Sequence, residues 1–269
     1  MMDVVLKKGK EKSLLRRHPW VYDTAVARIS GQAGPGDLVR VVSNSGLVLG
    51  IGGYSPASSL RVRMWTFHEA DDVASTAFLQ KRLGEALRAR EDLLKRTTAR
   101  RLVFAEADGL PGLVVDQYGD WLVTQFQSAA VEARREAITS ILMELTGAKG
   151  VFDRSDAATR QREGIAPHVG VLAGDEPPER IEVIEDGVRY GVDVRKGHKT
   201  GFYIDQRESR LAAQRLAREF REKNGRGLRV LNCFCYTGGF SLALMAGGAD
   251  SVDSVDSSAD ALAQARANA

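Results

Sequence analysis

The feature of this sequence that most constrains its fold is an apolar strand that runs directly into a glycine turn near the carboxyl end. We expect the strand at Val230–Cys233, the turn at Gly238 and Gly239, and a helix after the turn. A second strand is expected at residues 250–255, immediately before Asp256. A strand, a tight turn, a helix and a second strand in this order are typical of a doubly wound α/β domain. The pattern therefore predicts a Rossmann-like domain in the last part of the chain.

The glycine turn and Asp256 together predict a site for an adenosine-type ligand. Glycine lets the backbone approach a ligand closely, and the first turn of the following helix offers unpaired N–H groups. A carboxylate placed 18 residues after Gly238 can accept the hydroxyl groups of a ribose. The dinucleotide pattern Gly-x-Gly-x-x-Gly is missing, because Tyr236 occupies its first glycine position and Phe240 begins the helix. These bulky rings favour a ligand without phosphates, such as S-adenosylmethionine, and the alternative is an ordinary βαβ unit. Ser257, with Asp260, is expected to cap the last helix.

A loop at residues 196–207 strengthens this prediction. It carries Phe202 and Tyr203 side by side, followed by Gln206 and Arg207. Aromatic rings in such a loop can pack on an adenine or face a sulfonium, and the two polar side chains can bind the carboxylate of the methionine moiety. The alternative is a loop that buries both rings in the core.

Composition excludes several classes of protein. No apolar run is long enough to cross a bilayer, and lysines at positions 7, 8, 10 and 12 stand where a signal peptide needs apolar residues. The two cysteines, Cys233 and Cys235, make neither a disulfide framework nor a metal signature with the four histidines, so we expect no metal site. Two residues apart in one strand, they are expected to face the same way. A reducing cytoplasm is the simplest setting.

Charge is concentrated at the N-terminus, where residues 1–67 hold ten Lys and Arg against four Asp and Glu. This excess suggests a polyanion partner, and the alternative is a solvated basic face. The predicted fold is mixed: a small β-barrel at 1–67, a central α+β domain at 68–178 with a linking helix over 71–97, and the N-terminal part of a Rossmann-like domain at 179–269. The linker between the last two domains is residues 174–178.

Four segments resemble one known family. Residues 197–207 and 231–241 are similar to the signatures of class I S-adenosylmethionine-dependent ribosomal RNA methyltransferases, of the large-subunit cytosine-5 type. Residues 6–21 and 108–119 resemble the opening and the central domain of that family. The resemblance implies an N-terminal PUA domain that binds ribosomal RNA and a C-terminal domain that binds S-adenosylmethionine. It leaves a homodimer open.

The resemblance also implies roles for individual residues. Cofactor contacts are expected from Thr200, Phe202, Tyr203, Gln206, Arg207, Phe234, Tyr236, Thr237, Gly238, Gly239, Asp256 and Ser257. RNA contacts are expected from Lys8, Lys10, Arg16, Arg17 and Trp20, although a core role for Trp20 is an equal alternative.

Two motifs of that family are not found in this sequence: its Asp-Pro-Pro loop and its nucleophilic C-terminal cysteine. Methylation at cytosine C5 needs a thiolate that first adds to C6. We expect that nucleophile to lie beyond Ala269. The chain is then a shortened methyltransferase that has no catalytic residue of its own and is inactive or nearly so alone. Three alternatives stay open: a ribosomal RNA guanine methyltransferase, a non-catalytic PUA-type RNA-binding protein, and a nucleotide-dependent oxidoreductase.

Overall fold

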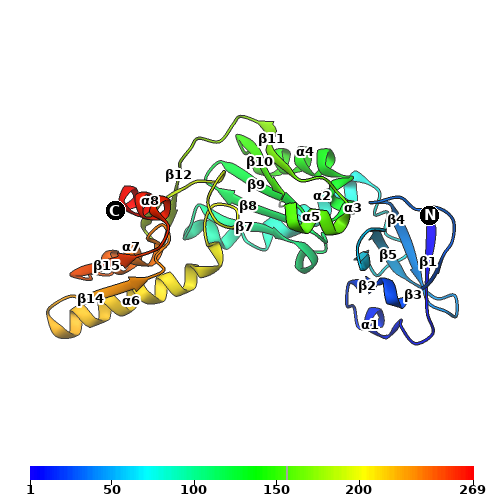
Figure 1. The fold of residues 1–269 in the computed structure, drawn as a ribbon, viewed down its shortest axis with the longest axis horizontal. Coiled ribbons are helices and arrows are strands. Elements are labelled where there is room, and N and C mark those ends of the chain that lie inside the picture. The colour runs from blue at the N-terminus through cyan, green and yellow to red at the C-terminus, as the bar shows by residue number, and fades with distance from the viewer. Residues whose placement is uncertain (156) are drawn as a thin grey trace. The chain divides into compact units, whose positions relative to one another are not determined.

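The computed structural model describes residues 1–155 and 157–269, which fall into two compact units (Figure 1). The first unit comprises residues 1–91 and 101–176, and the second comprises residues 92–100 and 177–269. The boundary at residue 177 lies in the expected linker. The first two expected domains belong to one compact unit, so their division at residue 67 stays a prediction.

The N-terminal part of the first unit is built from short strands. They are β1 (Met2–Leu6), β2 (Trp20–Tyr22), β3 (Val26–Ile29), β4 (Leu38–Val42), β5 (Val48–Tyr54) and β6 (Leu60–Thr66), with the one-turn helix α1 (Lys12–Leu15). They pair in the order β2-β6-β5-β4-β1-β3, and the β1–β4 pair is parallel. Bulges interrupt four of these pairings and let the strands bend around an apolar core. The expected strands at β4, β5 and β6 are confirmed, whereas β1, β2 and β3 were not among the strands named from the sequence.

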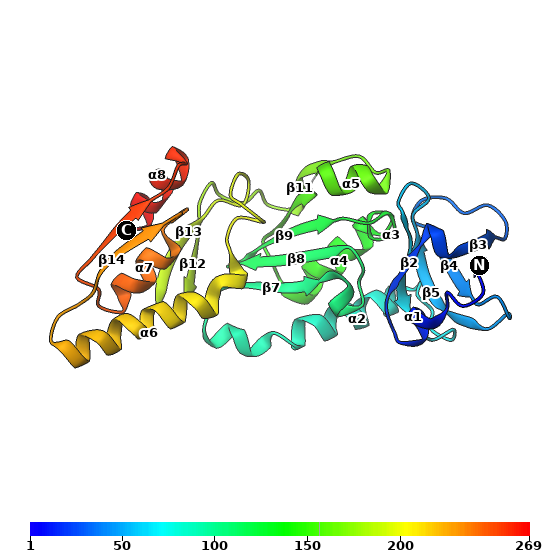
Figure 2. The same ribbon diagram turned by 60° about the horizontal axis from the view of Figure 1, so that its bottom comes forward.

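The remainder of the first unit is a sheet in the order β11-β10-β9-β8-β7 (Figure 2). Its strands are β7 (Ala99–Phe104), β8 (Leu113–Tyr118), β9 (Trp121–Phe126), β10 (Gly150–Ser155) and β11 (His168–Gly174). Its helices are α2 (Thr76–Arg88), α3 (Ala129–Glu132), α4 (Arg135–Thr146) and α5 (Ala157–Glu163). Leu83 of α2 and Leu142 of α4 are buried in one core with the strands, because each helix presents an apolar stripe. Ile51 and Trp65, from β5 and β6, belong to the same core.

The second unit contains the β-hairpin and the βαβ unit expected from the sequence. The hairpin is β12 (Ile181–Glu185) with β13 (Val188–Val192), and the helix α6 (Arg207–Asn224) follows. The strands β14 (Arg229–Cys233) and β15 (Ser251–Val255) are parallel and are joined through α7 (Gly239–Ala246), and α8 (Ala259–Asn268) comes last. Among the described residues, no helix combines the length and apolar character that crossing a bilayer requires.

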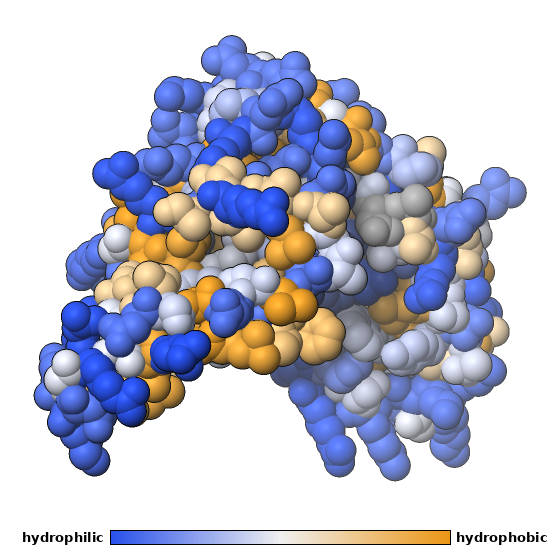
Figure 3. Space-filling model, turned by 60° about the vertical axis from the view of Figure 1, so that its left-hand side comes forward, coloured by the Kyte–Doolittle hydropathy of each residue, from blue (hydrophilic) through white to orange (hydrophobic). Residues whose placement is uncertain are grey.

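One face of the β14–β15 pair packs on helices, and the other is open. Val230 and Val252, which are register partners, pack with Ala217 of α6 and Leu244 of α7. Leu231 is 64% exposed on β14 and Val255 is 54% exposed on β15. Figure 3 shows apolar surface gathered among hydrophilic residues on this side. Parallel strands are ordinarily covered on both faces, so this open apolar face predicts a tendency to associate.

Two expectations about this unit are corrected. Cys233 is exposed and Cys235 is buried, so they do not share an environment. The reason is that β14 ends at Cys233 and the chain turns at once, which breaks the strand alternation. Ser258 caps α8 in place of Ser257, because the Ser258 hydroxyl accepts a hydrogen bond of 3.2 Å from the N–H of Ala261.

Candidate functional site

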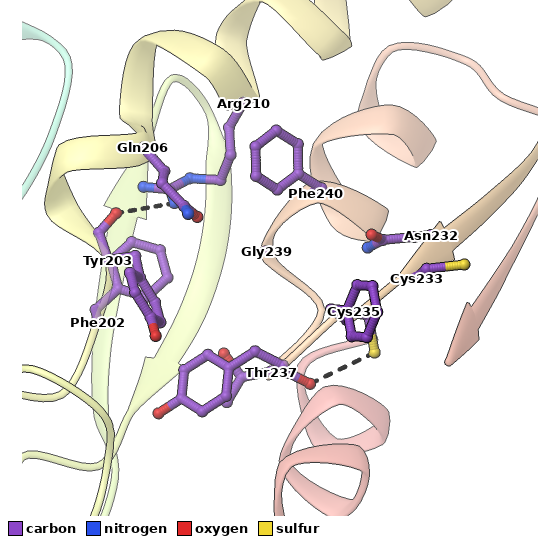
Figure 4. Close-up of a pocket in the computed structure, with 12 residues that line it drawn as sticks. Phe202, Tyr203, Gln206, Arg210, Asn232, Cys233, Cys235, Thr237, Gly239 and Phe240 are labelled. Carbon is purple, nitrogen blue, oxygen red and sulfur yellow. Dashed lines mark hydrogen bonds between the residues drawn. The ribbon is translucent and has the colours of Figure 1, made fainter. Parts of the chain in front are cut away.

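A cavity of about 420 Å³ lies in the second unit, between the loop that precedes α6 and the turn that follows β14 (Figure 4). Its size falls in the range of small-molecule sites. The lining comes from two segments that are more than 20 residues apart in the sequence. These residues are Phe202, Tyr203, Gln206, Arg210, Asn232, Cys233, Phe234, Cys235, Tyr236, Thr237, Gly239 and Phe240.

The turn after β14 has an uncommon backbone. Phe234 and Tyr236 have φ angles of 60° and 50°, and Gly238 has a φ angle of 80°. Positive φ costs nothing for glycine but is unfavourable for aromatic residues, and such conformations cluster at functional sites. The consequence is visible at Phe234, whose side chain is 91% exposed beside the cavity. The turn ends at Gly239, where α7 begins with N–H groups that have no partner inside the helix.

Asp256 holds this turn in place. One carboxylate oxygen accepts a hydrogen bond of 2.9 Å from the N–H of Ser258, and the other accepts one of 2.8 Å from the N–H of Tyr236. These two backbone donors lower the pKa of the Asp256 carboxyl, Ser258 contributing more than Tyr236, because they stabilise the ionised form. The side chain does not line the cavity. Its structural role is therefore to tie the end of β15 to the left-handed turn.

Three rings connect the turn to the 196–207 loop. The imidazole of His198 stacks on the ring of Tyr236, with centroids 4.4 Å apart and planes inclined by 12°. The hydroxyl of Tyr236 accepts a hydrogen bond of 2.7 Å from the backbone N–H of His198. Tyr203 packs edge-on against Tyr236, and its hydroxyl lies 3.2 Å from Nδ1 of His198. This cluster fixes the loop against the glycine turn and so shapes one end of the cavity.

A buried ion pair supports the other end. Arg210 of α6 donates hydrogen bonds to both carboxylate oxygens of Glu185, and their side chains are 3% and 2% exposed. Arg210 also donates to the carbonyl oxygen of Tyr203 at 3.0 Å. Its guanidinium lies 4.4 Å from the centroid of the Phe202 ring, which is only 4% exposed. Phe202 is thus largely in the core, as the alternative interpretation of the loop proposed, while Tyr203 is half-buried at the cavity.

Arg207 carries polar atoms that lack partners. Its side chain is 12% exposed, and its Nε and Nη1 atoms are buried without a hydrogen-bond partner among residues 1–155 and 157–269. The nearest charge is the carboxylate of Glu208, 3.7 Å from Nε. Buried donors without partners are costly, so this guanidinium suits an anionic group of a ligand. Gln206, one residue earlier, lines the cavity itself.

The two thiols at the cavity differ in exposure. Cys235 is 5% exposed, and burial raises the pKa of its thiol, with the nearby Asp256 carboxylate adding to the effect. A raised pKa lowers the thiolate fraction, which is the nucleophilic form. Cys233 is exposed at the end of β14.

The last residue of the chain does not line this cavity. Ala269 follows α8 directly and is not among the residues that line the 420 Å³ cavity. A smaller cavity of about 260 Å³, between α7, β15 and α8, includes Ala269 in its lining. The expectation that the catalytic nucleophile lies beyond Ala269 stays a prediction.

The structure brings most of the expected cofactor residues together. Those that line the cavity are Phe202, Tyr203, Gln206, Phe234, Tyr236, Thr237 and Gly239; those that do not are Thr200, Arg207, Gly238, Asp256 and Ser257. Sequence reasoning gave no role to Arg210 or Asn232 and treated Phe240 only as a bulky ring beside the turn. The sequence does contain a cue for Asn232, because this polar residue interrupts the apolar strand Val230–Cys233. In the structure its amide donates a hydrogen bond of 2.8 Å to the hydroxyl of Ser241. The sequence contains no cue for Arg210, because its ion-pair partner Glu185 is 25 residues away in the chain.

The expected RNA-binding residues lie on the surface of the first unit. Lys8, Lys10, Arg16 and Arg17 are exposed, and Trp20 is 36% exposed, which excludes a core role for its ring. Their contact with RNA stays a prediction. Among the described residues, no group of His, Cys, Asp and Glu is arranged to hold a metal ion.

Comparison with protein families decides the assignment of this fold. Residues 108–269 match the S-adenosylmethionine-dependent methyltransferase family, and residues 4–67 match the PUA-like domain. The chain belongs to the S-adenosylmethionine-dependent methyltransferase family. The expected PUA-like and Rossmann-like folds and the expected cofactor class agree with these matches.

This chain spans about 65% of the length of the relatives that it matches. The chain is 44% identical over 267 residues to "Ribosomal RNA large subunit methyltransferase I" of Shigella boydii, and the match covers 98% of this chain but 65% of that relative. A relative of the same name from Salmonella arizonae is 45% identical, and 64% of it is covered. A solved structure from Streptococcus mutans described as a methyltransferase has a TM-score of 0.79 at 23% identity, covering all of this chain and 66% of that one. Another, complexed with SAH, has a TM-score of 0.81 at 23% identity, with the same coverage. These two structures confirm the fold.

Proposed function

We propose that this chain forms the cofactor-binding part of a methyltransferase that transfers the methyl group of S-adenosylmethionine to large-subunit ribosomal RNA. The observation that carries the proposal is the left-handed turn at Phe234–Gly238, tied by Asp256 and placed at a cavity of suitable size. The family match supports the cofactor. The name of the relatives supports the ribosomal substrate.

The residues proposed to contact the cofactor, some lining the cavity and some outside its lining, divide into roles that fit this cofactor. Arg207, with its two unpartnered donors, and Gln206 suit the carboxylate of the methionine moiety. Tyr203 and Phe234 offer aromatic surface to the adenine or the sulfonium. Each Asp256 oxygen accepts one backbone hydrogen bond and keeps further acceptor capacity, which suits the two ribose hydroxyls. Thr200, Thr237, Gly238, Gly239 and Ser257 complete the proposed contact set.

Bound S-adenosylmethionine supplies an electrophilic methyl group, and the acceptor must supply the electron pair. We propose cytosine C5 as the acceptor atom, as the resemblance to the cytosine-5 enzymes implies. Attack from C5 requires a thiolate at C6 and a base that later removes the C5 proton. Cys235 is unsuited to this role, because its thiol is buried and has a raised pKa. We propose that neither Cys233 nor Cys235 is this nucleophile, and we therefore expect these 269 residues to bind cofactor with little or no transfer to cytosine.

The setting of the reaction is also part of the proposal. The partner is ribosomal RNA, docked by the N-terminal PUA-like module, and the two free thiols suit a reducing cytoplasm. Neither a membrane partner nor a metal is needed for this chemistry. A homodimer is compatible with it.

Isothermal titration with S-adenosylhomocysteine tests the cofactor site. We expect one site per chain, and Arg207→Gln weakens it at least about tenfold, because a charge-assisted contact is worth roughly 1.5–3 kcal/mol. Arg215→Gln is the matched control, since this arginine is exposed on the same helix, and it leaves the affinity unchanged. Equal binding by all three proteins contradicts the proposed orientation of the cofactor.

Transfer of labelled methyl groups to large-subunit ribosomal RNA, measured for these 269 residues and for a longer protein that contains them, tests the reaction. Nucleoside digestion of the product identifies the acceptor as 5-methylcytosine or a methylated guanine. Methylated guanine overturns the C5 proposal. Efficient 5-methylcytosine formation by the 269 residues alone overturns the expectation of inactivity.

A further inference from the structure

The segment of residues 92–100 belongs to the second unit and pairs with the turn of its hairpin. The N–H of Thr98 donates a hydrogen bond of 2.9 Å to the carbonyl oxygen of Ile184, and the N–H of Ile184 donates one of 2.9 Å to the Thr98 hydroxyl. The N–H of Asp186 donates to the carbonyl oxygen of Arg96 at 2.8 Å. These contacts fix the backbone of Arg96 beside the hairpin turn.

The guanidinium of Arg96 joins two carboxylates that come from different elements. Its Nε and Nη2 atoms donate to the two carboxylate oxygens of Asp186 at 2.8 and 2.9 Å, and its Nη1 atom donates to Oε1 of Glu208 at 2.9 Å. Asp186 lies in the hairpin turn, and Glu208 is the second residue of α6. The donors of a guanidinium form a rigid planar fork, so the bidentate contact with Asp186 fixes the direction in which Nη1 points. Arg96 is therefore a preorganised donor for Glu208.

The Glu208 carboxylate lies between Arg96 and Arg207 but is hydrogen-bonded to Arg96. The oxygen that accepts from Arg96, Oε1, is 3.7 Å from Nε of Arg207, which is beyond the length of a hydrogen bond. The Nε and Nη1 atoms of Arg207 keep their donors unpartnered among the described residues. The side chain of Glu208 is 68% exposed, so it has room to adopt another rotamer. Its hydrogen bond to Arg96 opposes a rotation toward Arg207.

We propose that Arg96 is a positioning residue that holds Glu208 away from Arg207 and so keeps the Arg207 guanidinium available to the carboxylate of the cofactor. Without Arg96, Glu208 turns toward Arg207 and pairs with it. The ligand carboxylate must then displace Glu208 before it can bind the same donors. This inference rests on the proposed function and deepens it, because it identifies a residue outside the cavity lining that sets the affinity for the anionic end of the cofactor.

Isothermal titration with S-adenosylhomocysteine, which carries the same carboxylate, tests the proposal. Arg96→Gln weakens binding about three- to fivefold, because exposed ion pairs such as the one Glu208 then forms shift an equilibrium by up to roughly that factor. This loss is smaller than that of Arg207→Gln and shrinks as salt is raised, since salt screens the competing pair. Lys95→Gln is the matched control, because Lys95 pairs with the exposed Asp92, and it binds as the wild type does.

Removal of the competing carboxylate separates positioning from a merely structural role of Arg96. Glu208→Gln alone binds up to about twofold more tightly than the wild type, because one negative charge beside the ligand carboxylate is gone. The double variant Arg96→Gln with Glu208→Gln binds as tightly as Glu208→Gln alone, since no carboxylate remains to pair with Arg207. A double variant as weak as Arg96→Gln shows that Arg96 only supports the fold, and it overturns the proposal.

A second probe, 5′-methylthioadenosine, contains the adenosine and the thioether but no carboxylate. Arg96→Gln leaves its affinity unchanged, and an equal loss for both probes overturns the inference. Wild-type binding of S-adenosylhomocysteine with no loss in Arg96→Gln overturns the inference alone and leaves the proposed function intact. No binding of either probe by the wild type overturns the proposed function and this inference with it.

Discussion

Arg210 and Glu185 form a buried, bidentate ion pair with hydrogen bonds of 2.7 and 3.0 Å, and this pair joins α6 to the hairpin beneath the cavity. Both side chains are almost completely buried, so neither charge has water to compensate for the loss of its partner. The pair also positions the carbonyl group of Tyr203 and the ring of Phe202. The loop at residues 196–207 is thus held in place by the Arg210–Glu185 ion pair and by the stacking of His198 on Tyr236.

Removing one member of this pair should destabilise the second unit strongly. We expect Arg210→Met to lower the free energy of unfolding by about 3–5 kcal/mol, because it leaves the Glu185 carboxylate buried and unpaired. The double variant Arg210→Met with Glu185→Leu recovers much of the loss. Urea unfolding measures both. Arg189→Met is the control, because its pair with Glu182 is exposed and spans 3.8 Å, and it should cost at most about 1 kcal/mol. A single variant no worse than this control would contradict the interpretation.

The contribution of Asp256 to the stability of the fold should depend on pH. Hydrogen bonds from Ser258 and Tyr236 hold its folded pKa below the ordinary value of about 3.9. The resulting stabilisation is fully present above that ordinary pKa and is lost as pH falls through the lower folded pKa. We expect the stability difference between the wild type and Asp256→Asn to be constant at neutral pH and to shrink below about pH 4. Urea midpoints across this range measure it. Asp253→Asn, at an exposed position of β15, is the matched control.

The hydroxyl of Tyr236 should matter for the loop more than for global stability. Tyr236→Phe keeps the stack on His198 but removes the acceptor for its backbone N–H. The net loss is about 0.5–1.5 kcal/mol, since the N–H of an exposed residue can turn to water. Hydrogen exchange at His198 should quicken by the corresponding factor, while exchange in β12 and β13 stays unchanged. Unaltered exchange at His198 would show that this hydrogen bond does not fix the loop.

The two thiols should react at different rates. Cys233 is exposed, whereas Cys235 is buried and its thiol has a raised pKa. Iodoacetamide at neutral pH should therefore alkylate Cys233 at least about tenfold faster, because the thiolate is the reactive form. Peptide mass spectrometry of partly labelled protein gives both rates. Denaturation should abolish the difference, and faster labelling of Cys235 in the folded chain would contradict the assigned burial.

Local pattern was sufficient for much of the fold. The glycine turn, the hairpin at Asp186 and the strands β4, β5 and β6 follow from spacing and turn chemistry, which are short-range properties. The same reasoning pointed to Tyr203 and Gln206, and the family resemblance pointed to Tyr236; all three line the cavity. It misplaced the cysteines, because it extended the strand alternation to Cys235, beyond the end of β14 at Cys233.

The sequence by itself determined the order of the modules, the βαβ corner and the cofactor class that the corner favours. Only the tertiary structure revealed that Asp256 anchors the turn, that Arg210 is paired with Glu185, and that Trp20 and Arg63 share Glu106. Each of these contacts joins residues at least 20 positions apart, and the Trp20 contact spans 86. Such pairs depend on how elements pack, and packing is decided by the burial of all the surrounding side chains rather than by any single segment.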